Sequence, residues 1–211
     1  RSVLRAVVEL PYGRIVTVFV VHAKSKRPLV SDALRHDQKS KAIGHAMSLV
    51  IRAAESTALR HLLVNEMETM RRPVIVIGDL NDNVHSVTTE IITGTVPWKR
   101  MSYTEKQRIW DVLLWSTNDV QVRRSDRDVN YSHIHNGRYE VLDHILVSQH
   151  FVRTYQNHFG CIMYQQLFND HLIDETLKDE KRTNIESDHA QVVAVIKLES
   201  DLTIQRRKLR M

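Results

Sequence analysis

Hydrophobic and polar residues alternate in several distinct ways along the chain, and each change of pattern predicts a different element. Residues 3–10 and 15–22 are rich in β-branched and apolar side chains, with Pro11-Tyr12-Gly13 between them, which predicts a β-hairpin. From 40 to 70 the apolar side chains recur at helical spacing, and Pro73 ends the pattern because proline cannot continue a helix. The expected buried face of this helix comprises Ile43, Ala46, Met47, Val50, Ile51, Ala54 and Ala58.

The second half of the chain predicts shorter elements separated by polar stretches. Residues 74–77 form a continuous apolar run, which is typical of a strand covered on both faces. Further strands are expected at 139–147 and 190–198, and helical segments at 87–92 and within 103–115. The polar stretches 123–138 and 169–186 are predicted as loops at the surface.

Several strands with one long helix between them indicate an α/β (α+β) sandwich. The length of 211 residues fits one domain, and no tandem repeat or low-complexity tract is present. We therefore expect a single domain over residues 1–198, followed by a basic tail at 199–211 that is exposed to solvent.

Charge and cysteine content narrow the class of protein. The net charge of +5 favours a polyanionic partner or a phosphate-bearing substrate. The single Cys161 excludes an internal disulfide and a zinc cluster built from cysteines. No apolar run reaches the roughly 18 residues that a membrane span requires, and no signal peptide is visible. The sequence leaves the compartment open, with a cytoplasmic location favoured, and it predicts no membrane span and no obligate protein partner.

Polar residues that could take part in catalysis or metal binding directly adjoin the apolar strands. His22 ends one strand, Gly78-Asp79-Leu80-Asn81 ends another, and Ser187-Asp188-His189 precedes the last. Strand ends form rims of a packed sheet, where side chains from distant parts of the sequence converge. Asp79 and Asn81 can orient a water or bind Mg²⁺ or Mn²⁺ through hard oxygen atoms. The same tetrapeptide can also be a plain turn.

Asp143 has an unusual position in the run Leu142-Asp143-His144-Ile145-Leu146-Val147. Its carboxylate is predicted to lie in the middle of an apolar strand, where a charge is costly unless it is paired. A histidine is a suitable partner, because a carboxylate fixes the imidazole tautomer and raises its basicity.

The order of these motifs resembles the endonuclease/exonuclease/phosphatase superfamily. The motifs are His22 with Lys24-Ser25, the Gly-Asp-x-Asn turn, the Asp-x-Ile-Leu-Val strand and Ser-Asp-His. The resemblance covers essentially the whole chain and implies a DNase I-like four-layer sandwich, in which two mixed β-sheets are flanked by helices. The N-terminal strands of that family, one with a metal-binding Glu, are expected to be missing. The 211 residues by themselves are therefore predicted to bind Mg²⁺ poorly and to show little turnover.

The resemblance also implies a role for each motif residue. Asp79 would activate the attacking water, and Asn81 would hold the substrate phosphate or a metal. Asp188, together with Asp79 and Asn81, would bind Mg²⁺ or Mn²⁺.

The histidines of the motifs would act on the phosphate. His189, steadied by Asp143, would transfer a proton or stabilise developing charge. His22 would be the second histidine facing the phosphate.

Further substrate contacts are expected beside these motifs. Lys24 follows His22 and extends a basic rim. The segment before Asp143 contains a cluster of polar side chains around a glycine that could grip phosphate: His133, His135, Asn136 and Arg138.

The predicted activity is hydrolysis of phosphodiester bonds by a divalent-metal-dependent, nuclease-like phosphoesterase, acting on a phosphate ester such as DNA or RNA. The alternatives are a phosphomonoesterase or lipid phosphodiesterase of the same superfamily, and an inactive module that binds phosphate. A different metallophosphatase fold is excluded, because its Gly-Asn-His motif does not occur in the chain.

Overall fold

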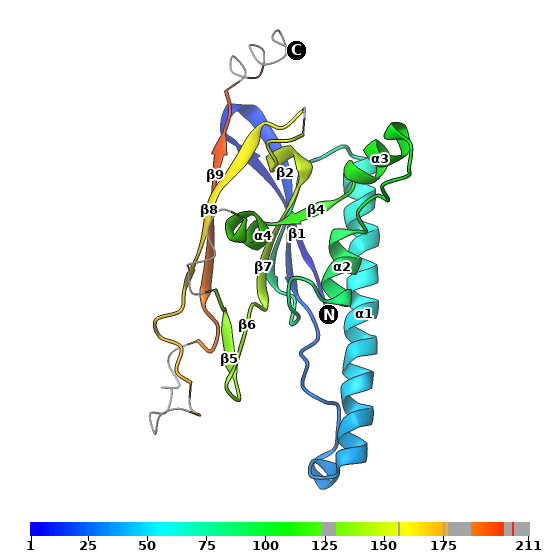
Figure 1. The fold of residues 1–211 in the computed structure, drawn as a ribbon, viewed down its shortest axis with the longest axis vertical. Coiled ribbons are helices and arrows are strands. Elements are labelled where there is room, and N and C mark those ends of the chain that lie inside the picture. Colours follow the sequence, from blue (N-terminus) through cyan, green and yellow to red (C-terminus); the bar gives the residue numbers. More distant parts are fainter. Residues whose placement is uncertain (124–129, 156, 175, 177–186, 201–203, 205–211) are drawn as a thin grey trace.

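The computed structural model describes residues 1–123, 130–155, 157–174, 176, 187–200 and 204. In Figure 1, a long helix, α1 (Gln38–Glu68), lies along one face of a central sheet, and the pair β8 (Gly160–Phe168) and β9 (Gln191–Leu198) lies along the other. The prediction of a mixed α/β fold is confirmed. None of the helices in the described residues combines the length and apolarity that crossing a membrane would need.

The central sheet has five strands in the order β1-β2-β3-β7-β4. Their bounds are Leu4–Leu10, Arg14–His22, Val74–Asp79, Asp143–Ser148 and Leu114–Ser116, respectively. β2 and β3 are parallel, and the other neighbours are antiparallel. The carboxyl ends of β2 and β3 and the amino end of β7 therefore meet at one edge of the sheet, where the predicted site residues occur.

Apolar side chains fill the space on both faces of this sheet. On one face, Phe19 and Val76 pack with Leu59 and Leu63 of α1. On the other, Val16 and Val147 pack with residues of β8 and of the 3₁₀ turn at Gln149–Phe151. The sheet is thus held rigidly between two layers, which fixes the positions of its strand ends.

The predicted buried face of α1 is wrong, because all seven of its residues between Ile43 and Ala58 are exposed. Ile43, Met47 and Val50 are more than half exposed, whereas Ser48, Arg52 and Ser56 are buried. Asp37 is the N-cap of the helix, and its side chain accepts a hydrogen bond from the Ser40 amide. The first turns of α1 extend past the sheet (Figure 1). The polar face packs instead on the segment after β2, where Ser48 donates to the Arg27 carbonyl and Arg52 to the Lys24 carbonyl.

Residues 123–138 were predicted to be a loop, but the described residues at the end of this segment form part of a hairpin. Strands β5 (His133–His135) and β6 (Arg138–Glu140) pair antiparallel across Asn136-Gly137. Asn136 has φ 50° and Gly137 φ 71°, as a tight I′-type hairpin turn demands. The strand predicted at 139–147 is divided between β6 and β7, so Asp143 is the first residue of β7 and does not lie in the middle of a strand.

Other elements either match the prediction or were not foreseen. The hairpin β1–β2, the strands β3 and β9, and α2 (Val87–Thr93) form as predicted, and α3 (Tyr103–Trp110) accounts for the helical part of 103–115. Strands β4 and β8 and helix α4 (Thr117–Val122) were not predicted. Parts of the predicted loops 123–138 and 169–186 and most of the tail 199–211 lie outside the described residues.

Candidate active site

Three site residues lie in a row across adjacent strands. In the register of the sheet, His22 is opposite Asp79, and Asp79 is opposite Asp143. His22 Nε2 lies 3.6 Å from Asp79 Oδ2. Side chains opposite each other on neighbouring strands share a face of the sheet and lie within contact distance. The strand pairing therefore assembles these three residues directly.

The turn after β3 holds Asp79 and Asn81 together. Asn81 has φ 54°, a conformation that asparagine tolerates better than most residues. Its backbone N–H donates to Asp79 Oδ1 at 2.7 Å, and its side-chain Nδ2 donates to Asp79 Oδ2 at 2.7 Å and to the Ala23 carbonyl at 3.1 Å. The amide nitrogen is thus used by the protein, and the amide oxygen is the atom that can face a ligand.

Asp143 and His189 form the pair predicted between a carboxylate and a histidine. His189 Nδ1 and Asp143 Oδ2 are 2.7 Å apart. Ser132, which is fully buried, holds both segments of the chain: its hydroxyl accepts from the Asp143 amide, and its carbonyl accepts from the amide of Ala190, the residue after His189. Ser132 was not predicted, because a serine in a polar stretch has no distinguishing pattern in the sequence.

The pKa values of Asp79 and His189 are both shifted in directions that favour acid–base chemistry. Burial raises the pKa of the Asp79 carboxyl above its usual value, and the nearby charge of Asp143 adds to the shift, against the N–H of Asn81. The hydrogen bond to Asp143 raises the pKa of His189, although burial opposes it. Asp79 is thereby a stronger base than an ordinary aspartate, and His189 retains its proton at higher pH.

A second group of residues, not predicted, supports the turn from behind. The buried His144 has its Nε2 2.8 Å from the Asp82 carbonyl oxygen. The Asp82 carboxylate accepts hydrogen bonds from Arg52 at 3.2 Å and Thr88 at 2.7 Å. Asp82 directly follows the Gly-Asp-x-Asn turn in the sequence, and this adjacency is the one signal that could have identified it.

The predicted substrate-contacting residues occupy different places. His133 lies at the base of the β5–β6 hairpin and pairs with His189 through an antiparallel bridge. His135, Asn136 and Arg138 are exposed at the tip of the hairpin. Lys24 has its ammonium group bound to the carbonyls of the polar segment that follows it. Of these predicted substrate-contacting residues, only His133 lies next to the other site residues, through its contact with His189.

The oxygen atoms near the turn suit a hard divalent ion. Asp79, Asp143 and His189 have ligand atoms within 4.8 Å of one another, and so do His133, Asp188 and His189. Among the described residues, Asp79 and Asp188 do not share one such group of three. Mg²⁺ is commonly bound by one or two carboxylates with several waters. The Asp79 carboxylate and the Asn81 amide oxygen fit that requirement.

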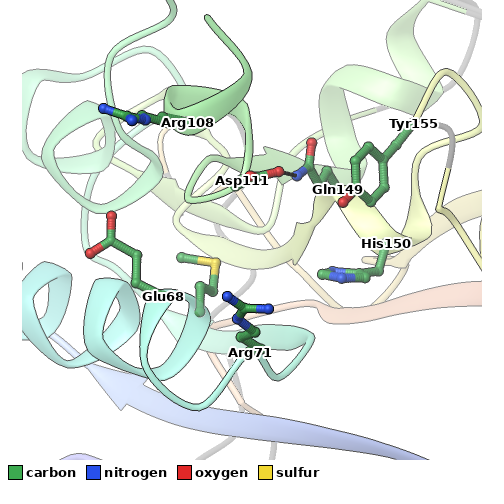
Figure 2. A pocket seen from close by; sticks show the side chains of 8 residues that line it. Glu68, Arg71, Arg108, Asp111, Gln149, His150 and Tyr155 are labelled. Carbon is green, nitrogen blue, oxygen red and sulfur yellow. Dashed lines mark hydrogen bonds between the residues drawn. The ribbon is translucent and has the colours of Figure 1, made fainter. Parts of the chain in front are cut away.

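A cavity of about 490 Å³ lies near the other end of the sheet, where β3 begins and β7 ends (Figure 2). Gln149, in the turn after β7, donates to Asp111 at 2.6 Å across it. The cavity is lined by Met67, Glu68, Arg71, Arg108, Asp111, Gln149, His150 and Tyr155. It contains none of the predicted site residues and lies at the opposite end of β3 from Asp79.

A carboxylate–histidine pair and an Asp-x-Asn turn thus lie together at one edge of the sheet. No protein-family model and no curated protein sequence matches this chain. The solved structures similar to it include endonuclease/exonuclease/phosphatase family proteins, the superfamily that the order of the motifs resembles.

Three of these structures illustrate the level of similarity. The human Nocturnin catalytic domain with bound sulfate has a TM-score of 0.49 at 16% identity, over 93% of this chain and 52% of that one. The Bacteroides thetaiotaomicron mannosyl-6-phosphatase Bt3783 has a TM-score of 0.47 at 14% identity, over 88% of this chain and 52% of that one. The Neisseria meningitidis 3'-5' exonuclease NExo has a TM-score of 0.45 at 17% identity, over 93% of this chain and 71% of that one. The chain thus spans about half the length of the first two.

Proposed function

We propose that the full-length protein is a divalent-metal-dependent phosphoesterase that hydrolyses phosphodiester bonds. The observation that supports this most strongly is the cross-strand row of His22, Asp79 and Asp143, with His189 bound to Asp143 at 2.7 Å. The row combines a buried base, an oriented imidazole and a second histidine on one side of the sheet. Hydrolysis of a phosphate ester requires a base for water and positive charge for the phosphate oxygens.

Each residue has a defined task in this proposal. Asp79 accepts a proton from the attacking water, since partial burial raises the pKa of its carboxyl and makes it a stronger base than an ordinary aspartate. His189 stays protonated beside Asp143 and donates to the phosphate, where its charge stabilises negative oxygens. His22, which is exposed and 3.6 Å from Asp79, faces the phosphate from the other side.

Asn81 orients the base and contributes to binding of the metal. Its two N–H groups hold both oxygens of Asp79, so the carboxylate has one orientation. A bound Mg²⁺ or Mn²⁺, held by the Asp79 carboxylate and the Asn81 amide oxygen, would neutralise charge on the phosphate.

A nuclease-like phosphodiesterase is favoured over the related phosphomonoesterase and lipid phosphodiesterase activities. The exposed hairpin tip with His135, Asn136 and Arg138 can contact phosphates beyond the one that is cleaved. Contacts to successive phosphates suffice for a duplex, because they position the protein without reading bases. The net charge of +5 supports the same class of substrate.

Metal removal tests the activity directly. The full-length protein, expressed from its natural start codon, is expected to cleave plasmid DNA or a model phosphodiester in Mg²⁺ or Mn²⁺. With excess chelator, turnover should fall to background and return when the metal is restored. Inositol phosphates, sphingomyelin and a model phosphomonoester assayed in parallel distinguish the alternatives. A folded protein that is silent on every substrate, or whose turnover resists chelation, contradicts the proposal.

The pH dependence tests the pair of Asp143 and His189. The carboxylate raises the pKa of His189, so the imidazolium persists to higher pH. A rate that needs this imidazolium falls as pH rises through that raised pKa. In the Asp143→Asn variant the pKa of His189 drops, and the alkaline limb of kcat/KM should move to lower pH.

The exposed Asp32→Asn variant, remote from the pair in the sequence and on the segment before α1, is the control and should keep the original profile. An alkaline limb that stays in place in Asp143→Asn, measured with the same substrate and metal, would show that His189 does not act as the acid.

A further inference from the structure

The base of the β5–β6 hairpin brings two imidazoles and a carboxylate together beside the row of site residues. His133 is directly opposite His189 in an antiparallel bridge, and their ring centroids are 4.7 Å apart. A ring nitrogen of each histidine and a carboxylate oxygen of Asp188 lie within 4.8 Å of one another. We propose that His133, Asp188 and His189 form a binding site for a divalent transition-metal ion, with Zn²⁺ as the expected occupant.

The ligand types favour a transition metal over magnesium. Two imidazole nitrogens with one carboxylate oxygen are a common protein ligand set for zinc, whereas Mg²⁺ is bound mainly through oxygen atoms. This set differs from Asp79 and Asn81, which offer oxygen atoms to the ion in the proposed function. Zn²⁺ and Mg²⁺ would therefore bind to two different sets of ligands.

The orientation of His189 supports the same conclusion. A histidine that binds a metal through one ring nitrogen almost always gives its other ring N–H to a carboxylate or carbonyl. His189 Nδ1 is held by Asp143 at 2.7 Å, which leaves Nε2 as its ligand atom. The outer partner that a metal-binding histidine requires is therefore already in place.

His133 provides a second, independent indication. Its Nδ1 is buried and has no hydrogen-bond partner among the described residues. A buried polar atom without a partner costs about 1–3 kcal/mol, and binding of an ion at this Nδ1 would offset that cost.

The ligand atoms need only a small movement to bind one ion. With metal–ligand bonds of about 2.0 Å, the ligand atoms of a tetrahedral site are roughly 3.3 Å apart. The atoms here lie within 4.8 Å. Rotation of the exposed Asp188 side chain and of the half-buried His133 ring supplies the difference.

Occupation of this site would regulate the activity, and this part of the inference depends on the proposed function. An ion bound to His189 Nε2 takes the nitrogen that is needed at the phosphate. Zn²⁺ should therefore inhibit hydrolysis. At ten times its dissociation constant, turnover in constant Mg²⁺ is expected to fall about tenfold.

Binding is measured without any substrate. Calorimetric titration of the full-length protein with Zn²⁺, and the visible absorption of bound Co²⁺, should both report a site that is lost in His133→Ala. The affinity should fall by more than about 100-fold, since even an outer partner of a ligand is typically worth about 10- to 100-fold. His45→Ala, which removes an exposed histidine of α1, is the matched control and should bind zinc as the wild type does.

Two further arms separate this proposal from the proposed function. Asp79→Asn should lose hydrolysis and yet bind zinc within about twofold of the wild type, because Asp79 is not a ligand of this site. The ratio of rates with and without Zn²⁺ should approach one in His133→Ala. Wild-type protein without a zinc site, or His133→Ala with unchanged affinity and Co²⁺ spectrum, would overturn the inference whether or not the protein hydrolyses phosphate esters.

Discussion

Replacing Asp79 by asparagine is expected to lower kcat/KM for the best substrate by about 10²- to 10⁴-fold, the usual contribution of a positioned acid or base. Asparagine has nearly the same shape as aspartate but cannot accept a proton from water. The carboxylate is largely buried, lies opposite both His22 and Asp143, and has both oxygens oriented by Asn81. No other carboxylate in the row is free for this role, because Asp143 is committed to His189.

The measurement is steady-state hydrolysis by the full-length protein at saturating Mg²⁺, with circular dichroism to show that the variant is folded. The exposed Asp32→Asn variant should retain wild-type rates. Turnover by Asp79→Asn within a few-fold of the wild type would exclude Asp79 as the base.

The Gly78→Ala variant is expected to lose about 3 kcal/mol or more of its free energy of unfolding, at the upper end of single substitutions. Gly78 has φ 131°, a conformation that side-chain-bearing residues rarely adopt. A Cβ at this position would overlap the backbone carbonyl oxygen of Val21, its partner on β2, which cannot rotate away. The added methyl group must therefore push β2 and β3 apart beside His22 and Asp79.

Gly13→Ala is the matched control, since Gly13 also has a positive φ, 65°, but no atom lies within 4 Å of an added Cβ. It should cost only the conformational penalty of about 1–2 kcal/mol. Urea unfolding followed by circular dichroism compares the two variants. Equal losses for both would mean that backbone conformation alone, and not the contact between the two strands, makes Gly78 necessary.

The residues of the candidate site could be identified from the sequence because each adjoins an apolar run. His22 and Asp79 end such runs, which places them at sheet edges, whereas Asp143 was expected inside a run and in fact begins β7. Which edge they share depends on strand direction and order, which periodicity does not contain. The parallel pairing of β2 with β3 is a tertiary property.

The errors have separate physical causes. The apolar spacing of Ile43, Met47 and Val50 is a valid helical pattern, but pattern alone does not show which face meets the sheet. The hairpin at 133–140 was missed although Asn136-Gly137 is the strongest local signal for a tight turn, because its flanking strands are polar and three residues long. Short strands such as β4 depend on pairing with a neighbour for their existence.

The contributions of Ser132 and Asp82 were also missed, although Asp82 directly follows the Gly-Asp-x-Asn turn in the sequence. Both act through bonds to the backbone or to residues distant along the chain: Ser132 binds the Asp143 amide, and Asp82 binds Arg52 of α1. Contacts of this type depend on the folded arrangement, and neither residue differs in type from the many exposed serines and aspartates.

The alignment of His22, Asp79 and Asp143 across β2, β3 and β7 makes the chemistry of the site depend on one strand register. A slip of one residue in either pairing would turn the shifted side chains to the other face of the sheet. Recovery of activity during refolding would then report correct pairing of these three strands, and not merely collapse or formation of α1. Activity of the site would therefore measure the fraction of molecules that have formed the native strand register.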